Sequence, residues 1–553
     1  MNVDSLTREE ALELFFSLPD ESETSEDEAL SSEDEFVPEL APPDSSPDED
    51  DNEAGPSTSK RKKRRPTISK NRKKSKRETV EPYHEVGDVL GEEVGDKWST
   101  NEPPIRVGIP KSWDPHFSTK AVVRAADCFD LYFDDEVLEM IVERTNRAGA
   151  LKYPKKWAVL TSDELRAYFG LLFLMSVSPR HHFYHYWSRD SLFNCEEIAK
   201  VMSFKRFQYI MNSLRVNDPS KEKKRGEDGY DRLAKLRPLI DKLNKKFQEE
   251  YSPSSHQAID ESMVAFKGRS SMKQYLPMKP IKRGYKVWCR ADSKTGYLLQ
   301  FQVYEGKNAQ RPANQSLGEH VVLSLSENVQ PGTRLFFDNY FTCTRLMETL
   351  AERSILAAGT VRTNRKDLPE ELKRNNKLKK GEYLWRSKGQ VTAYQWRDTK
   401  DVHLLSNFHD PTETVEVSRK LANGSSVAVI CPKALADYNM SIGAVDKFDQ
   451  KRNAYTSDRR SKKSWYRIFY FLFDASVVNV FIQYCANNDI TYLWFRLVLG
   501  RQLINGQRFR HYTSTGPFRK NKEGRKNGQK MVGVSEEIRF TGSGHNPQKV
   551  PTR

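Results

Sequence analysis

Apolar residues recur at helical spacing through residues 118–250. One run repeats every three or four residues, with Lys and Arg on the opposite side and Pro238 inside it: Leu233, Leu236, Ile240, Leu243 and Phe247. This spacing gathers apolar side chains on one face of a helix. Another helix is expected after Thr161, where the sequence Thr161-Ser162-Asp163-Glu164 predicts a capping box in which Glu164 reaches back to the N-cap amide. We therefore expect residues 118–250 to be mainly α-helical.

From residue 255 the pattern changes to short apolar runs rich in aromatic and β-branched residues, which are typical of strands. Two of these runs flank Gly296 and predict a hairpin. The expected strands are 285–291, 297–304, 334–337 and 357–361, and the expected helices are 316–327 and 344–353. Short strands and turns follow over 366–430, including 394–396 and 402–405, and helix returns near Ile442. The order predicts a mixed α/β region.

The N-terminal residues are polar and strongly charged. Asp20–Glu53 is acidic and poor in apolar residues, so we expect residues 17–80 to be disordered. Two basic clusters follow, and they predict a nuclear localisation signal or a nucleic-acid-binding arm, with an inert tail as the alternative. Their residues are Lys60, Arg61, Lys62, Lys63, Arg64, Arg65, Arg72, Lys73 and Lys74.

The charge is divided unevenly along the chain. The net charge of +14 combines −19 over residues 1–53 (twenty acids, one Arg) with +12 over 54–77, so residues 78–553 carry +21. Such a body favours a polyanionic partner, although a solvated basic surface has the same composition. The six cysteines are scattered and predict neither a disulfide framework nor a zinc finger. No apolar run is long enough to predict a membrane span; we take Tyr168–Val177 as the longest.

Four aspartates are candidates for chemistry. Asp260 and Asp338 are each expected at the end of an apolar strand, where a carboxylate is rigidly held yet open to substrate. Asp446 and Asp449 are spaced to share one helix face. Singly, each could be a turn, cap or ion-pair residue, and Asp292 and Asp398 are read as structural.

Converging carboxylates repel and need cations, and oxygen ligands suit Mg²⁺ or Mn²⁺. Two such ions can support in-line phosphoryl transfer. Basic residues that could hold phosphates flank the acids, with Phe266, Tyr275, Tyr285 and Trp288 interleaved. The candidate DNA-binding residues are Lys267, Arg269, Lys273, Lys282, Arg283, Lys286, Arg362, Lys451, Arg452, Arg459 and Arg460.

Several segments resemble motifs of piggyBac-family transposases. Ala258–Arg269 and Met272–Pro280 resemble the first catalytic-aspartate motif, Phe337–Thr342 the second, Gly359–Arg365 a segment following it, and Asn439–Gln450 the third. The motifs occur in the family's order, and the resemblance covers roughly residues 110–510.

The resemblance implies an α/β fold with an added α-helical part: an RNase H-like catalytic core with an inserted β-rich domain, flanked by an α-helical dimerisation and DNA-binding domain. Its expected boundaries are 1–80 (disordered tail), 81–255 (helical, first part), 256–365 (core), 366–430 (insertion), 431–455 (core, last part), 456–510 (helical, second part) and 511–553 (basic tail).

The resemblance also implies the chemistry and the partners. Asp260, Asp338 and Asp446 would hold two Mg²⁺ or Mn²⁺ ions, with Asp449 as an accompanying catalytic acid. The reaction would be cut-and-paste cleavage of double-stranded DNA at transposon terminal repeats, with insertion at TTAA targets. A homodimer in the nucleus is expected, and no membrane association.

One departure from the family opens an alternative. Family members usually carry a C-terminal cysteine-rich zinc domain, and no cysteine follows Cys485, so no zinc is expected. The alternative is a domesticated DNA- or chromatin-binding protein without transposition activity; a carboxylate-pair hydrolase of another class would not need the basic flanks.

Two aromatic segments have competing readings. His181–Trp187 is predicted to pack rather than bind zinc, and the segment from Trp465 to Phe471 is predicted to be a buried helix rather than a base-stacking platform.

Overall fold

The computed structural model describes residues 97–100, 110–118, 123–277, 279–306, 311–312, 314–374, 376–420, 424–458 and 463–509. The tails predicted over 1–80 and 511–553, with the basic clusters, lie outside these residues, as do Arg459 and Arg460.

The helices expected between residues 118 and 250 are present. They are α2 (Ala125–Asp130), α3 (Asp135–Lys152), α4 (Ser162–Val177), α5 (Glu196–Val201), α6 (Phe204–Ser213) and α7 (Arg237–Glu249), with short 3₁₀ turns at Phe183–Trp187 and Pro219–Lys221. The helix predicted from Leu233 begins four residues later, because Pro238 is tolerated only in a first turn. Half of the predicted capping box forms: Thr161 accepts from the Glu164 amide, but the Glu164 carboxylate pairs with Arg206 instead.

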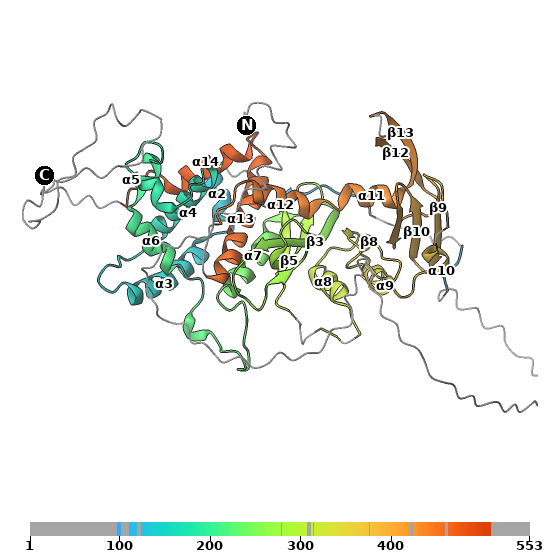
Figure 1. Ribbon diagram of the computed structural model, residues 1–553, viewed down its shortest axis with the longest axis horizontal. Helices are drawn as coiled ribbons and strands as arrows, with labels where there is room; N and C mark the ends of the chain where they lie inside the picture. Colours follow the sequence, from blue (N-terminus) through green and yellow to red (C-terminus); the bar gives the residue numbers. More distant parts are fainter. Residues whose placement is uncertain are drawn as a thin grey trace, which may run out of the picture. The chain divides into compact units, whose positions relative to one another are not determined.

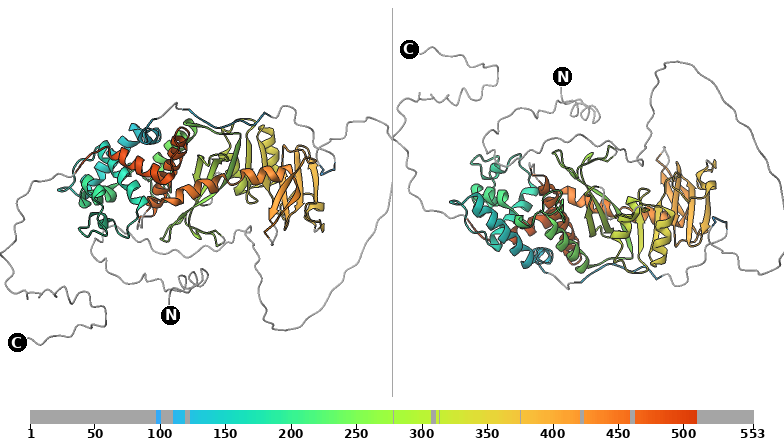
Figure 2. Two further views of the ribbon diagram at one scale, coloured as in Figure 1. Left: turned by 90° about the horizontal axis from the view of Figure 1, so that it is seen from above. Right: turned by 90° about the horizontal axis from the view of Figure 1, so that it is seen from below.

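Two helices that follow the strands of the sheet in the sequence complete the same bundle (Figure 2). α13 (Ser464–Cys485) packs against α2 and α7, and α14 (Tyr492–Ile504) packs against α4 and α2. α4 and α14 meet at Gly170 and Gly500, where a Cβ on Gly170 would lie 2.6 Å from the Gly500 carbonyl oxygen. The bundle is therefore built from segments that precede and follow the sheet in the sequence.

The sheet has nine strands in the order β4-β5-β3-β7-β8-β11-β10-β9, with β6 also paired to β5. Their bounds are β3 (His256–Ala265), β4 (Gln274–Tyr275), β5 (Arg283–Asp292), β6 (Leu298–Val303), β7 (Arg334–Phe337), β8 (Leu356–Thr360), β9 (Tyr383–Lys388), β10 (Val391–Arg397) and β11 (Asp401–Ser406). β3, β7 and β8 run parallel, whereas β5 is antiparallel to β3. Two short pairs lie apart, β1 (His116–Phe117) with β2 (Tyr251–Ser252), and β12 (Thr414–Lys420) with β13 (Ser426–Pro432).

Most of the predicted local elements are confirmed. The β5–β6 hairpin turns at Gly296, which has a φ of 76°. Asp292 closes that turn by accepting from the Lys294 and Thr295 amides, the structural role predicted for it. α8 (Leu317–Leu325) and α9 (Thr344–Glu352) form where helices were expected. The return to helix comes earlier than predicted, with α11 (Lys433–Ser441) preceding α12 (Ala444–Ala454).

The strands expected in the inserted region extend the main sheet. β11 pairs with β8 through Ser406 and Ala358, and β10 and β9 follow it outward. Only β12 and β13 form a separate pair among the described strands of this region, and Arg419 of β12 pairs with Asp398 at 3.0 Å. The boundary predicted at residue 366 thus falls inside a sheet that continues across it.

Helices cover both faces of the sheet (Figure 1). α11 and α12 lie across one face against β3, β5 and β8. α8 and α9 cover the other, where Ile259, Trp288 and Phe337 pack with helix side chains such as Val322. The β3 backbone is therefore shielded on both sides, and its side chains alternate between the two layers.

α13 is the longest apolar helix that the structure describes. By length and composition it could cross a membrane, and it exceeds the Tyr168–Val177 run that was taken as the longest. In the fold it is enclosed by the bundle: Phe469, Tyr470 and Phe471 are buried, which confirms the prediction of a core helix over a stacking platform.

A buried ion pair joins α13, α14 and the segment that follows α12. Arg496 and Asp474 are both buried, with Nη2 and Oδ1 3.3 Å apart. Asp474 also accepts the Ser457 amide at 2.9 Å, and Arg496 donates to the Ser457 hydroxyl. The pair thus fixes where the chain leaves α12 and enters the bundle.

We predict that Asp474→Ala lowers the free energy of unfolding by about 3–5 kcal/mol, because it leaves a buried guanidinium unpaired. Urea unfolding followed by circular dichroism measures the loss. Asp127→Ala is the control, since Asp127 pairs with Arg124 on the surface and should shift the midpoint far less. Equal losses in the two variants would contradict the assignment.

Candidate active site

The register of β3 and β7 places two of the predicted acids side by side. The parallel ladder ends at the pair Ile259 and Phe337. The next residues on the two strands are Asp260 and Asp338, and neighbouring strands lie about 4.8 Å apart. Asp338 follows directly after β7, as predicted, whereas Asp260 lies in the middle of β3 opposite Cys289, not at a strand end. β3 continues past Asp260 because β5 still pairs with it there.

A fixed turn holds the Asp338 carboxylate. Its Oδ1 accepts the Tyr340 amide at 2.8 Å, and its carbonyl accepts the Thr342 hydroxyl at 2.8 Å. α8 presses on this turn, since a Cβ on Gly318 would lie 2.7 Å from the Tyr340 carbonyl oxygen. Backbone bonds of this kind set the direction of an aspartate side chain.

The other two acids lie on α12, on one face as predicted. Asp449 is half-buried, and its Oδ1 accepts the Ser262 hydroxyl at 2.7 Å. Ser262 is two residues beyond Asp260 on β3 and therefore points to the same side of the sheet. Asp446, one turn earlier, is exposed. The structure thus attaches Asp449 to the strand that carries Asp260, and it leaves Asp446 at the surface.

Burial raises the pKa of these carboxyls. The pKa of Asp260 rises to about 7 through burial, with the charges of Glu261 and Asp338 adding to the effect. Burial also raises the pKa of Asp338 and of Asp449. The Tyr340 amide opposes this rise at Asp338, and Arg452 and Ser262 oppose it at Asp449. Lys279 partly balances the group through Glu261, 2.9 Å away. Lys279 and Arg452 thus oppose the effect of burial at these carboxyls without cancelling it.

The chemistry of this donor set suits a hard divalent cation, because carboxylate oxygens are the ligands that Mg²⁺ and Mn²⁺ favour. Within the described residues, however, no three His, Cys, Asp or Glu side chains stand close enough together to hold one ion. Asp260 and Asp338 provide a pair of donors on neighbouring strands, and Asp449 is hydrogen-bonded to the strand that carries Asp260.

Sequence reasoning missed Tyr438 of α11 at this site. Its hydroxyl lies 3.3 Å from the Thr360 hydroxyl. Burial raises the pKa of Tyr438 to about 12, and the nearby Asp338 and Asp260 charges contribute. The available signal was position: Tyr438 directly precedes the Asn439–Gln450 motif, and no periodicity marks it.

Known proteins resemble this chain over most of the part that the structure describes. A family model described as "Transposase IS4" matches residues 124–481. The human PiggyBac transposable element-derived protein 3 is 32% identical over 356 residues, covering 62% of this chain and 57% of that protein. The human PiggyBac transposable element-derived protein 2 is 28% identical over 410 residues, covering 70% and 67%. The chain belongs to the piggyBac family of transposases.

A solved structure shares the architecture of this piggyBac family member. It is a piggyBac transposase in a synaptic complex with hairpin DNA, with a TM-score of 0.62, 26% identity, and coverage of 72% of this chain and 83% of that one. The similarity supports the mixed α/β fold. The chain spans little more than half the length of the first human relative.

The basic residues proposed for DNA binding in this piggyBac-family chain divide by exposure. The exposed ones are Lys267, Arg269, Lys282, Arg283 and Arg362. Lys273 and Lys451 are half-buried and donate to the carbonyls of Gly268 and Thr295, respectively. The first group is available to a partner as the structure stands.

Two further cations proposed for DNA binding lie inside the fold. Lys286 is buried with its Nζ 4.4 Å from the Trp288 ring centre. Arg452 is buried, pairs with Asp449 at 3.1 Å and lies over Phe471. The residue types alone could not reveal this, because burial depends on what packs above them. Their contacts position the site instead.

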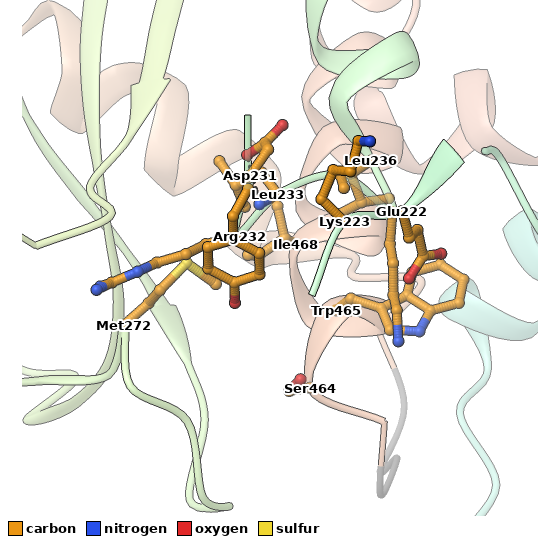
Figure 3. Close-up of a pocket in the computed structure, with 13 residues that line it drawn as sticks. Glu222, Lys223, Asp231, Arg232, Leu233, Leu236, Met272, Ser464, Trp465 and Ile468 are labelled. Atoms are coloured by element: carbon orange, nitrogen blue, oxygen red, sulfur yellow. Dashed lines mark hydrogen bonds between the residues drawn. The ribbon is translucent and has the colours of Figure 1, made fainter. Parts of the chain in front are cut away.

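A pocket of about 300 Å³ lies apart from the aspartates (Figure 3). Met272, from the basic segment between β3 and β5, faces Arg232 and the start of α13 at Ser464 and Trp465. None of the four aspartates lines the pocket. Its relevance is that Met272, 9% exposed, anchors the basic segment to the bundle.

The histidine-rich segment packs as predicted. His182 stacks on Tyr184, His185 stacks on Phe193, and Tyr186 is buried. Rings of this segment therefore stack on neighbouring rings in the same part of the bundle.

We predict that Asp260→Asn stabilises the metal-free protein at pH 8 by about 1–3 kcal/mol. This range is smaller than the full pKa shift would give, because solvent screens a carboxyl that is partly exposed. The pKa of Asp260 rises from 3.8 unfolded to about 7 folded. Between pH 3.8 and about 7, folding therefore takes up a proton. As the pH rises through this range, the Asp260 carboxyl lowers the free energy of unfolding by an increasing amount.

Urea unfolding in EDTA at pH 4.5 and pH 8 measures the effect of this variant. The gain should be small at pH 4.5 and full at pH 8, while Asp135→Asn, at an exposed carboxyl, should show none. A gain of the same size at both pH values would contradict the assigned pKa.

Proposed function

We propose that this protein is a metal-dependent DNA transposase that cuts transposon ends and joins them to TTAA targets. The observation that carries the proposal is the placement of Asp260 beside Asp338 on adjacent parallel strands, with exposed cations on the flanking segment. Membership of the piggyBac family supports the same reaction class.

We assign an RNase H-like core to residues 256–365 and 431–455. Strands β6-β5-β3-β7-β8 form a continuous mixed sheet, with Asp260 on the central strand and Asp338 after the next one. α12 lies against β3 and brings its acids to the same side. This arrangement supports the assignment.

Asp260, Asp338 and Asp446 would hold two Mg²⁺ or Mn²⁺ ions, with Asp449 beside them. Bound ions supply charge neutralisation, activation of water or a 3′-hydroxyl and stabilisation of the leaving oxygen. The exposed position of Asp446 requires α12 or its side chain to shift toward β3 when ions and DNA bind. Such tightening on binding is ordinary in catalytic sites.

The chain's own groups orient this site. The Tyr340 amide fixes Asp338, and Ser262 with Arg452 fixes Asp449. Lys279 pairs with Glu261 next to Asp260, and it would neutralise part of the charge that a DNA phosphate brings. Tyr438 of α11 is buried near these acids, where its hydroxyl is hydrogen-bonded to Thr360.

The partner that we propose is double-stranded DNA carrying transposon ends, bound by a homodimer. The similar solved structure is a synaptic complex with hairpin DNA. The basic clusters at Lys60–Arg65 and Arg72–Lys74 support a nuclear location.

A second candidate is a domesticated DNA-binding protein without cleavage activity. The observation in its favour is that Asp446, one of the proposed metal ligands, is exposed on α12. The human relatives are also named as transposable element-derived proteins. DNA binding without cleavage in any divalent metal would select this candidate.

We predict that Asp260→Asn, Asp338→Asn and Asp446→Asn each reduce strand cleavage and joining by more than about a hundredfold, because each removes a metal ligand worth several kcal/mol. The measurement uses terminal-repeat DNA with Mg²⁺ or Mn²⁺. Asp135→Asn, an exposed residue of α3, should cleave like the wild type. Wild-type rates in the three site variants would refute the metal site.

We predict that a triple variant, Lys267→Gln, Arg269→Gln and Lys282→Gln, weakens DNA binding and flattens its salt dependence. Each lost phosphate contact reduces the slope of log K against log salt by about 0.9. The matched control removes three exposed lysines of the 366–430 region, Lys379, Lys380 and Lys400. If both variants flattened the slope equally, the flanking segment would have no special role.

A further inference from the structure

Four aromatic residues interleave with the basic residues between Asp260 and Asp292, and the structure separates them. Phe266, Tyr285 and Trp288 are no more than 4% exposed, and they pack in the core. Tyr275 is 59% exposed. Of these four rings, Tyr275 alone can reach a partner from outside.

Tyr275 is displayed on a rigid support. It belongs to β4, where Tyr275 pairs with Arg283 and Gln274 with Gly284 of β5. A Cβ on Gly284 would lie 2.0 Å from the Val264 carbonyl oxygen, so β5 is pressed against β3 at the base of this support. The Arg283 guanidinium lies 5.1 Å from the centre of the Tyr275 ring. The ring is therefore held in place from one side by a cation.

The surroundings of Tyr275 attract phosphates. Lys267, Arg269 and Lys282 are exposed on the same segment, and residues 262–291 contain no acid. An exposed ring among cations is the combination that stacks on nucleobases while the cations follow the backbone. In a duplex both faces of each base are already stacked, so the base must be unpaired.

We propose that Tyr275 is a stacking residue for an unpaired nucleobase of the bound DNA, with Arg283 supporting the ring. The inference rests on the proposed function, since it needs DNA as the substrate. It assigns a recognition role to a residue that takes no part in holding metal.

The register also locates the base. Tyr275 and Arg283 lie on the same side of the sheet as Asp260 and its partner Cys289, because paired and alternate residues share a face. Arg283 and Cys289 are six positions apart on β5, which corresponds to about 20 Å. At the duplex rise of about 3.4 Å per nucleotide this distance corresponds to about six nucleotides, and an extended unpaired strand spans it with fewer. The stacked base therefore lies away from the cleaved bond.

The test compares Tyr275→Ser and Tyr275→Phe with the wild-type full chain. The probes are terminal-repeat DNAs carrying unpaired bases, each with one 2-aminopurine at a different distance from the cleaved phosphate, and a fully paired duplex of equal length. Tyr275→Ser should lose about tenfold in affinity for the unpaired probes and none for the duplex, because stacking contributes about 1–3 kcal/mol per base. Tyr275→Phe should retain binding and fluorescence quenching.

Tyr184→Ser is the matched control, since Tyr184 is 52% exposed in the helical part. Wild-type affinity of Tyr275→Ser for unpaired probes, equal loss on the duplex, or strongest quenching at the nucleotide next to the cleaved phosphate would each overturn the inference. Cleavage that still depends on Asp260 would then leave the proposed function intact. Failure of the wild type to bind any of these DNAs would end both.

Discussion

The parallel pairing of β3 with β7 is the constraint on which the rest of the site depends. It fixes Asp260 next to Asp338 at the point where the ladder ends, under helices that keep water from both faces of the sheet. Burial of Asp260 in these surroundings raises its pKa, and the neighbouring charges of Glu261 and Asp338 add to the effect. The buried carboxyls therefore lower the stability of the metal-free fold, and a bound cation would remove this cost. Functional sites often reduce the stability of the protein that holds them.

The second constraint is the attachment of α12. The Ser262–Asp449 hydrogen bond and the Arg452 ion pair hold this helix on the central strand. Beyond α12, the Asp474–Arg496 pair directs the chain into α13 and α14. The helix α12 thus lies between the sheet and a bundle whose helices come from residues far apart in the sequence, so the stability of the bundle and the geometry of the site are linked.

Charge and burial divide the basic residues into two functions. Cations that cover aromatic rings or pair with Asp449, such as Lys286 and Arg452, give the site its shape. Cations on the segment between β3 and β5 stay exposed around Tyr275, while Met272 anchors that segment to the bundle. One stretch of sequence therefore supplies both the wall of the site and the surface that meets a polyanion.

The sequence alone determined the local elements and the family: strand and helix periods, the Gly296 turn, the shared face of Asp446 and Asp449, and ordered motifs. These depend on neighbours in the chain, which a sequence displays directly. Tertiary structure decided that Asp260 lies mid-strand, that Tyr438 joins the acids, that Lys286 and Arg452 are buried, and that the strands after residue 366 extend the main sheet. Each of these follows from pairing between distant segments, and pairing sets burial, register and the distance between charges.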